Sequence, residues 1–158
     1  MVNDQLGLVV VALNEQDGFA ISTPRWQRLA QDALAWLGLQ HGEVNLLFVD
    51  EQRMAQLNED HLGNAYPTDV LAFPLDGDAA TECGESLIGD VVLCPIRASA
   101  QAREHAGRGL HDGSVEDELA LLIVHGILHL LGFDHYDRAT TEQMQAREQA
   151  ILQEHYWP

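Results

Sequence analysis

Three histidines lie in the most apolar part of the chain, in the stretch VHGILHLLGFDHYD that spans residues 124–137. His125 and His129 are four residues apart, so on a helix both imidazoles project from one face and can chelate one metal ion. Gly132 permits a left-handed backbone that ends the helix and turns the chain back, which brings His135 towards that face. Metzincin proteases use the same H-x3-H-x5-H spacing, with glycine three residues after the second histidine. The spacing therefore predicts a metal site with His125, His129 and His135 as ligands.

The predicted ligand set indicates a catalytic ion. Three neutral imidazoles leave the fourth tetrahedral position for water. Zinc suits such a set, although nickel, cobalt or copper would also bind it in vitro. We therefore expect one Zn²⁺ per chain. Gly126 stands where HExxH proteases carry a glutamate as general base, which argues against a peptidase. Asp134 and Asp137 flank His135 and are the nearest candidates to move a proton; orienting a histidine or capping the next helix is the alternative role.

Hydrophobic periodicity and turn residues predict the elements that position these histidines. Strands are expected at residues 5–12, 43–49, 70–75 and 87–93. Helices are expected from an N-cap at Thr23 to about Leu37, from Asp50 to about Asn58, over residues 96–105, from an N-cap at Ser114 to Leu131, and from Thr140 or Thr141 to about Glu154. The acidic, glycine-rich residues 76–85 suggest a long loop. We predict one metallohydrolase domain over residues 1–158: an α/β sandwich with a small mixed four-stranded sheet, about five helices and the metal site on a central helix.

The charge balance is strongly acidic, with 25 Asp and Glu against 8 basic residues, all arginine, and a net charge of −17. This charge repels nucleic acid at long range, but screening lets a local arginine cluster or a metal dominate one cleft. Cys83 and Cys94 form no CxxC pair, no apolar window reaches the roughly 18 residues of a membrane helix, and Asp4 stands where a signal peptide needs positive charge. We expect a reduced, cytoplasmic setting without membrane or export.

The motif at residues 125–135, HGILHLLGFDH, resembles the signature of the YbeY family, bacterial single-strand-specific metallo-endoribonucleases that act in ribosomal RNA maturation. PTDVLAF at residues 67–73 and LIGDV at residues 87–91 resemble two further family motifs, although the family usually has serine at the position of Ala72. The resemblance covers most of the chain. It implies a zinc hydrolase that cuts single-stranded RNA, acts in 3′-end maturation of 16S ribosomal RNA and 70S ribosome quality control, and binds the ribosome or ribosomal proteins. It also implies that His125, His129 and His135 are the ligands.

The sequence departs from this family in one respect: Leu62 stands where the family commonly has an arginine thought to face RNA. Leucine cannot grip a phosphate through paired charge-assisted bonds. Arg97 or Arg103 is a candidate to supply that phosphate contact instead. For both residues, however, the preferred interpretation is a solvated charge on a helix. Asp69 is a second candidate catalytic residue; shaping the entry to a strand is its alternative role.

Four other histidines lie outside the metal spacing and are predicted at the surface: His41, His105, His111 and His155. Glu118 lies seven residues before His125 on the same helical stripe, and a solvated or first-turn role is preferred for it. Two alternative functions stay open. One is a metal-stabilised ribosome-assembly factor that binds a protein partner without significant catalysis. The other is a metallohydrolase acting on another substrate.

Overall fold

The computed structural model describes residues 7–63, 68–75 and 87–157. Along the chain the elements are β1 (Leu8–Asn14), α1 (Thr23–Trp36), β2 (Gly42–Phe48), α2 (Glu51–Leu62), β3 (Val70–Pro74), β4 (Leu87–Leu93), α4 (Pro95–Ala102), the 3₁₀ helix η2 (Arg103–His105), α5 (Val115–Leu130) and α6 (Arg138–His155). The strand order is β1-β2-β4-β3, with β1, β2 and β4 parallel and β3 antiparallel to β4. A four-stranded mixed sheet with five α-helices in the described part of the chain confirms the predicted architecture.

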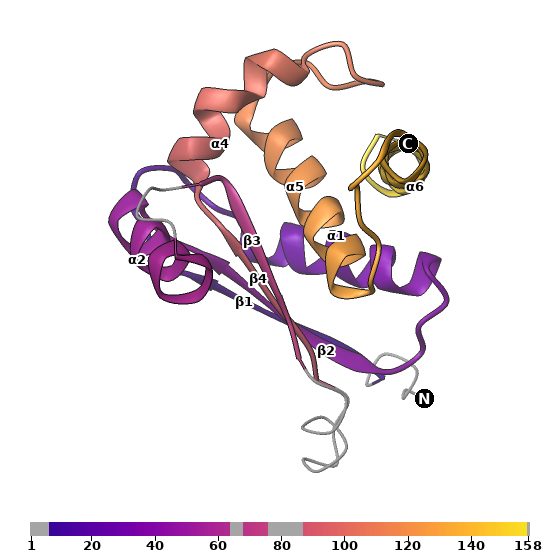
Figure 1. Cartoon of the computed structure of the whole chain (residues 1–158), viewed down its shortest axis with the longest axis horizontal. Coiled ribbons are helices and arrows are strands. Elements are labelled where there is room, and N and C mark those ends of the chain that lie inside the picture. Colours follow the sequence, from indigo (N-terminus) through magenta and orange to yellow (C-terminus); the bar gives the residue numbers. More distant parts are fainter. Residues whose placement is uncertain (1–6, 64–67, 76–86, 158) are drawn as a thin grey trace.

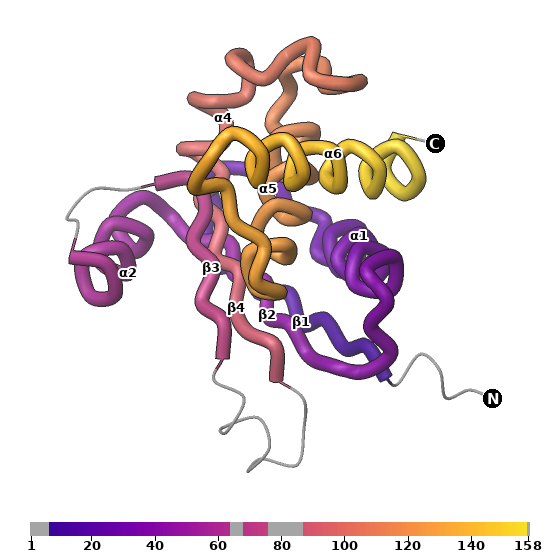
Figure 2. The backbone as a smooth tube through the Cα atoms, turned by 45° about the vertical axis from the view of Figure 1, so that its right-hand side comes forward, coloured from indigo at the N-terminus to yellow at the C-terminus, as the bar shows by residue number. Residues whose placement is uncertain are grey.

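The two faces of the sheet are covered differently, as Figure 1 shows. Alternate residues of a strand point to opposite faces. Val70 and Ala72 of β3 accordingly pack with the main core under α1 and α5, whereas Leu71 packs in a second core with Met54 of α2. Helix α6 crosses α5 (Figure 2) and also contacts α1. Helix α5 is therefore central, and twelve of its sixteen residues are buried.

The predicted strands are confirmed to within three residues, the largest difference being the start of β1 at Leu8, and the other differences lie mainly at helix ends. Ser22, not Thr23, is the N-cap residue of α1, because Thr23 already has helical geometry. Asp50 caps α2 as predicted, since its side chain accepts a hydrogen bond from the Arg53 N–H at 2.8 Å. Helix α2 runs four residues beyond the predicted end and stops at Leu62, where the left-handed Gly63 ends it.

Helix α6 begins earlier than predicted. The Asp137 carboxylate accepts from the Thr140 N–H at 2.8 Å, and the Thr140 hydroxyl accepts from the Asp137 N–H at 3.1 Å. This reciprocal capping box starts the helix at Arg138 and gives Asp137 the capping role. The loop predicted at residues 76–85 lies outside the described residues. No helix in the described ranges is long and apolar enough to cross a membrane.

Candidate metal centre

The two ends of α5 are built by local hydrogen bonds. At its start, the Ser114 hydroxyl accepts from the Asp117 N–H at 3.1 Å, as predicted for the N-cap residue. At its end, Gly132 has φ of +95°, and its N–H donates to the His129 carbonyl at 3.0 Å. A residue with a side chain would be strained at this φ. Gly132 therefore reverses the chain and returns His135 to the face of the helix that carries the first two histidines.

The structure brings the three histidines together. One ring nitrogen of each of His125, His129 and His135 lies within 4.8 Å of the others. The Nε2 atoms of His125 and His129 are 3.1 Å apart, close to the separation of about 3.3 Å for two ligands at 2.0–2.1 Å in a tetrahedron. Burial, and then the positive charge of the neighbouring His125 and His135, lower the pKa of His129. Because metals bind the neutral ring, this donor set fits a divalent ion.

A fourth residue completes the site, and the sequence-based prediction missed it. Glu148 on α6 is 2% exposed, and its Oε2 lies 2.5 Å from Nδ1 of His125. A carboxylate only accepts hydrogen bonds, so Nδ1 carries the proton and the lone pair of Nε2 points at the centre. The available signal was positional: Glu148 takes one place in the buried stripe of α6, whose other members are Met144, Ile151 and Leu152.

A pocket of about 450 Å³ opens beside the three histidines. Leu62 at the end of α2 lines the pocket, together with four residues of β3, namely Val70, Leu71, Ala72 and Pro74. The rest of the lining is His125, Gly126 and His129 on α5, and His135 beyond the end of that helix. Leu62 is 59% exposed. None of the eight arginines, all of which the structure describes, lines this pocket. The walls therefore offer apolar surface and the three imidazoles, without a permanent positive charge.

The position of Gly126 has a packing explanation. A Cβ added there would lie 2.7 Å from Cγ1 and 3.2 Å from Cγ2 of Val91, a fully buried residue of β4. Distances below 3.0 Å require the neighbour to move, and a β-branched side chain in a packed core has little room to do so. Close contact between α5 and the sheet therefore leaves no space for the glutamate of an HExxH enzyme.

Replacing Gly126 by alanine is expected to lower the free energy of unfolding by about 1 kcal/mol. Overpacking typically costs 1–3 kcal/mol, and the better helix propensity of alanine returns at most about 1 kcal/mol. Urea unfolding of Gly126→Ala, Val91→Ala and the double variant measures this. In the Val91→Ala background the space is open, so Gly126→Ala should be neutral or stabilising. An equal loss in both backgrounds would contradict the packing explanation.

The two candidate catalytic aspartates occupy different environments. Asp69 immediately precedes β3 and is half-buried. Burial raises the pKa of its carboxyl and the negative charge of Glu118 adds to this, while backbone hydrogen bonds and the charge of His125 act in the opposite direction. Asp134 is exposed, and its Oδ1 accepts from the His135 N–H at 2.7 Å. Asp134 therefore shapes the turn that presents His135, and neither aspartate lines the pocket.

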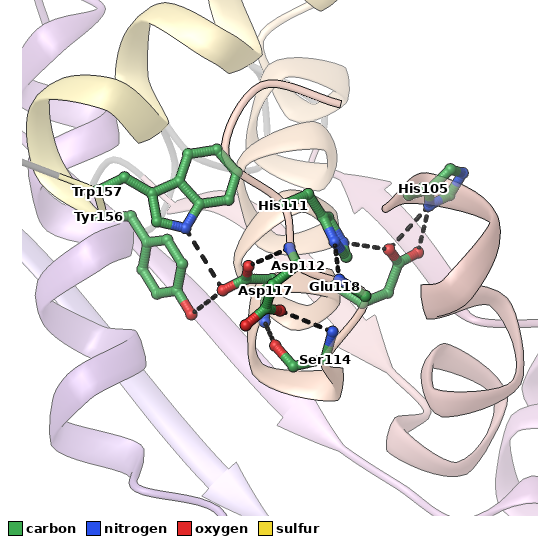
Figure 3. Close-up of polar contacts among 9 residues, drawn as sticks. His105, His111, Asp112, Ser114, Asp117, Glu118, Tyr156 and Trp157 are labelled. Atoms are coloured by element: carbon green, nitrogen blue, oxygen red, sulfur yellow. Dashed lines mark hydrogen bonds and ion pairs between the residues drawn. The ribbon is translucent and has the colours of Figure 1, made fainter. Parts of the chain in front are cut away.

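Glu118 and two of the predicted surface histidines form a cluster (Figure 3). Glu118 lies in the first turn of α5, as one of its two predicted roles had it, but it is buried and not solvated; the surface prediction is wrong for His111, whereas His105 is partly exposed. Glu118 is fully buried and His111 is 4% exposed. The Glu118 carboxylate lies 2.8 and 2.9 Å from Nδ1 of His105 and 3.0 Å from Nε2 of His111. These contacts attach residues 105–111 to α5, the helix that also carries His125 and His129.

The cluster of Glu118, His105 and His111 has the composition of a second metal site, but its hydrogen bonds explain it without one. The Gly113 N–H donates to Nδ1 of His111 at 3.0 Å, so Nδ1 is an acceptor. The proton of a neutral ring then sits on Nε2, which donates to Glu118 and has no lone pair for a metal.

Asp117, next to Glu118, attaches the other end of α6 (Figure 3). Its carboxylate accepts from the Asp112 N–H at 2.8 Å, from the Tyr156 hydroxyl at 2.9 Å and from Nε1 of Trp157 at 3.4 Å. It does not complete a capping box with Ser114, whose N–H donates to Asp112 instead. Burial, together with the bond to Asp117, raises the pKa of Tyr156. Helix α5 is thus fixed to α6 at Asp117 as well as at the pair His125–Glu148.

The two arginines suggested as RNA contacts lie away from the three histidines. Arg97 on α4 forms an exposed ion pair with Glu51 at 3.7 Å, and Arg103 is exposed on η2. Exposed pairs of this kind add little stability. Arg103 has the environment of a solvated helix charge, whereas the Nε of Arg97 is buried without a hydrogen-bond partner; neither arginine lines the pocket.

Comparison with known proteins agrees with the site. The sequence model of the family described as Endoribonuclease YbeY matches residues 12–156. A protein of Acidothermus cellulolyticus named Endoribonuclease YbeY is 44% identical over 118 residues, 70% of this chain and 68% of the relative. One of the same name from Salinispora tropica is 38% identical over 152 residues, 90% of this chain and 93% of the relative.

Among solved structures, the solution structure of TM1509 from Thermotoga maritima superposes with a TM-score of 0.58 and 26% sequence identity, and the match covers 92% of this chain and 90% of that one. The family match extends over nearly the whole chain and includes all three clustered histidines. This chain therefore belongs to the YbeY endoribonuclease family.

Proposed function

We propose that this chain is a zinc-dependent endoribonuclease that cleaves single-stranded RNA, folded as a single domain over residues 1–158. Its role would be in 3′-end maturation of 16S ribosomal RNA and in 70S ribosome quality control, in the cytoplasm. The observation that carries the proposal is the convergence of His125, His129 and His135, with two Nε2 atoms 3.1 Å apart at the end of a pocket of about 450 Å³. Membership of the YbeY endoribonuclease family supports RNA as the substrate.

Each site residue has a distinct role in this proposal. His125, His129 and His135 would hold one Zn²⁺, which when bound would act as a Lewis acid on the phosphate. The Glu148 carboxylate accepts a hydrogen bond from the Nδ1–H of His125 and so keeps the lone pair of Nε2 free to bind the metal. Asp69 stays our candidate catalytic residue, because it immediately precedes β3, whose residues line the pocket, and because burial raises the pKa of its carboxyl. Asp134 holds the backbone of His135.

A non-catalytic assembly factor is the second candidate. Gly126 supplies no general base, no arginine lines the pocket, and the net charge of −17 suits a basic ribosomal protein as partner. The two candidates share one metal centre, so metal content does not separate them. Turnover does.

Metal removal is the experiment that tests the proposal. Purified chain, depleted of metal with a chelator and dialysed, is expected to cut a labelled single-stranded RNA at less than one-tenth of its original rate, because the three histidines then lack their Lewis acid. One equivalent of Zn²⁺ should restore the rate, and a duplex of the same sequence should resist cleavage throughout. Cleavage that is unaffected by depletion would contradict the enzymatic proposal, and absence of cleavage with zinc would favour the assembly factor.

A further inference from the structure

Among the residues that the structure describes, no permanently charged side chain lines the pocket beside the three histidines, so protein cations do not hold a phosphate there. None of the eight arginines lines it, the chain has no lysine, and its remaining histidines also lie elsewhere. Proteins normally hold RNA backbones through lysine and arginine. A metal on the three histidines would contact one phosphate, so a single strand in this pocket needs further affinity from another part of the nucleotide.

The apolar walls of the pocket supply that affinity. Leu62 projects from the end of α2 and is 59% exposed, although it lines a pocket. Val70, Ala72 and Pro74 of β3 line the same pocket. The volume of about 450 Å³ lies within the range of small-ligand sites. Among the parts of a nucleotide, the sugar and phosphate are polar, and only the base has broad apolar faces.

We propose that this wall, defined by Leu62, Val70, Ala72 and Pro74, binds one nucleobase of the substrate strand and so presents the adjoining phosphate to the three histidines. This inference rests on the proposed function and names the contact that selects single strands. A base in a duplex is stacked and paired, so its faces are not available to the wall. Because aliphatic contact with the face of a base reads none of its hydrogen-bonding groups, the wall should tolerate all four bases.

Binding that depends on the base should respond weakly to salt. Each single-strand phosphate neutralised by a protein cation contributes a slope of about −0.7 in log K against log salt, or about a threefold loss of affinity between 50 and 200 mM. With no arginine in the pocket, we expect a loss of threefold or less over this range. A protein that holds several phosphates would lose tenfold or more.

The experiment measures equilibrium binding by fluorescence anisotropy of the full chain to a labelled, nuclease-resistant 2′-O-methyl RNA, with an abasic strand of the same length as comparison. Leu62→Ser is expected to raise the Kd five- to tenfold. The matched control is Leu110→Ser, at an equally exposed leucine (56%) outside the pocket, which should leave the Kd unchanged. The wild-type chain should bind the abasic strand at least tenfold more weakly than the RNA.

Equal binding of the abasic strand, or an unchanged Kd in Leu62→Ser, would overturn the base-binding proposal. Cleavage of ordinary single-stranded RNA by the same preparations separates this result from the proposed function. If the wild-type chain cleaves RNA but the Kd changes neither in Leu62→Ser nor with the abasic strand, the endoribonuclease proposal is supported and the base-binding proposal is contradicted. If the wild-type chain does not cleave RNA but the Kd rises both in Leu62→Ser and with the abasic strand, the base-binding proposal is supported and the catalytic proposal is contradicted.

Discussion

Replacing His129 by alanine is expected to abolish both zinc binding and RNA cleavage while the chain stays folded. His129 lies between the other two histidines, with its Nε2 3.1 Å from that of His125 and its ring centroid 5.0 Å from that of His135. Its loss leaves two ligands for the ion. Loss of a supporting residue alone typically costs 10–100-fold in metal affinity, so loss of a ligand should cost more than 100-fold.

The stability of His129→Ala should change little. The ring is only half-buried and lines a pocket, and alanine is a better helix former than histidine, so we expect a change of about 1 kcal/mol or less. Zinc content after dialysis, circular dichroism and thermal unfolding measure the two effects separately. His41→Ala, at an exposed histidine outside the pocket, is the matched control. A folded His129→Ala protein that retained one tightly bound zinc would show that the three histidines are not the metal site.

Replacing Glu148 by alanine is expected to weaken zinc binding 10–100-fold, with a corresponding loss of cleavage at limiting zinc. Without the carboxylate 2.5 Å from Nδ1 of His125, the ring is no longer fixed in the tautomer that leaves Nε2 free. Glu148→Gln should restore part of the affinity, because the amide oxygen still accepts the hydrogen bond without the charge.

Competition with a zinc-binding dye measures these affinities, and Glu142→Ala is the control on the same helix, where Glu142 forms only an exposed pair with Arg138. Glu148 is buried, so its loss also affects stability, and the unfolding free energy should be recorded in parallel. A purely structural role would give a less stable protein with unchanged zinc affinity, and that result would exclude Glu148 as a positioning residue.

Local patterns were enough to predict the elements of this fold. The strands are short apolar runs between turn residues, and the caps at Asp50 and Ser114 depend only on neighbouring residues. The three histidines were predicted for the same reason, because the helix period and the glycine at position 132 set their geometry locally. The start of α6 differs from the prediction because Thr140 does not begin the helix but completes a capping box begun by Asp137.

The residues that support the histidines depend on tertiary contacts and could not be found this way. Glu148 lies 23 residues from His125 in sequence, on a helix whose packing angle no local pattern fixes. Glu118 and His111 have polar side chains, so exposure was the reasonable expectation. They are buried because each is the hydrogen-bond partner of the other. The reason for glycine at position 126 also lies in another element, in Val91 of β4.

The central claim is that one zinc ion on three histidines cleaves single-stranded RNA. The most direct test is a titration of metal-depleted wild type and His129→Ala with zinc, recording the initial rate of cleavage of one labelled single-stranded RNA at each step. The account predicts that the wild-type rate rises in proportion to zinc and saturates at about one equivalent per chain, while the variant stays at background. Equal rates for the two proteins, or a wild-type rate independent of zinc, would contradict it.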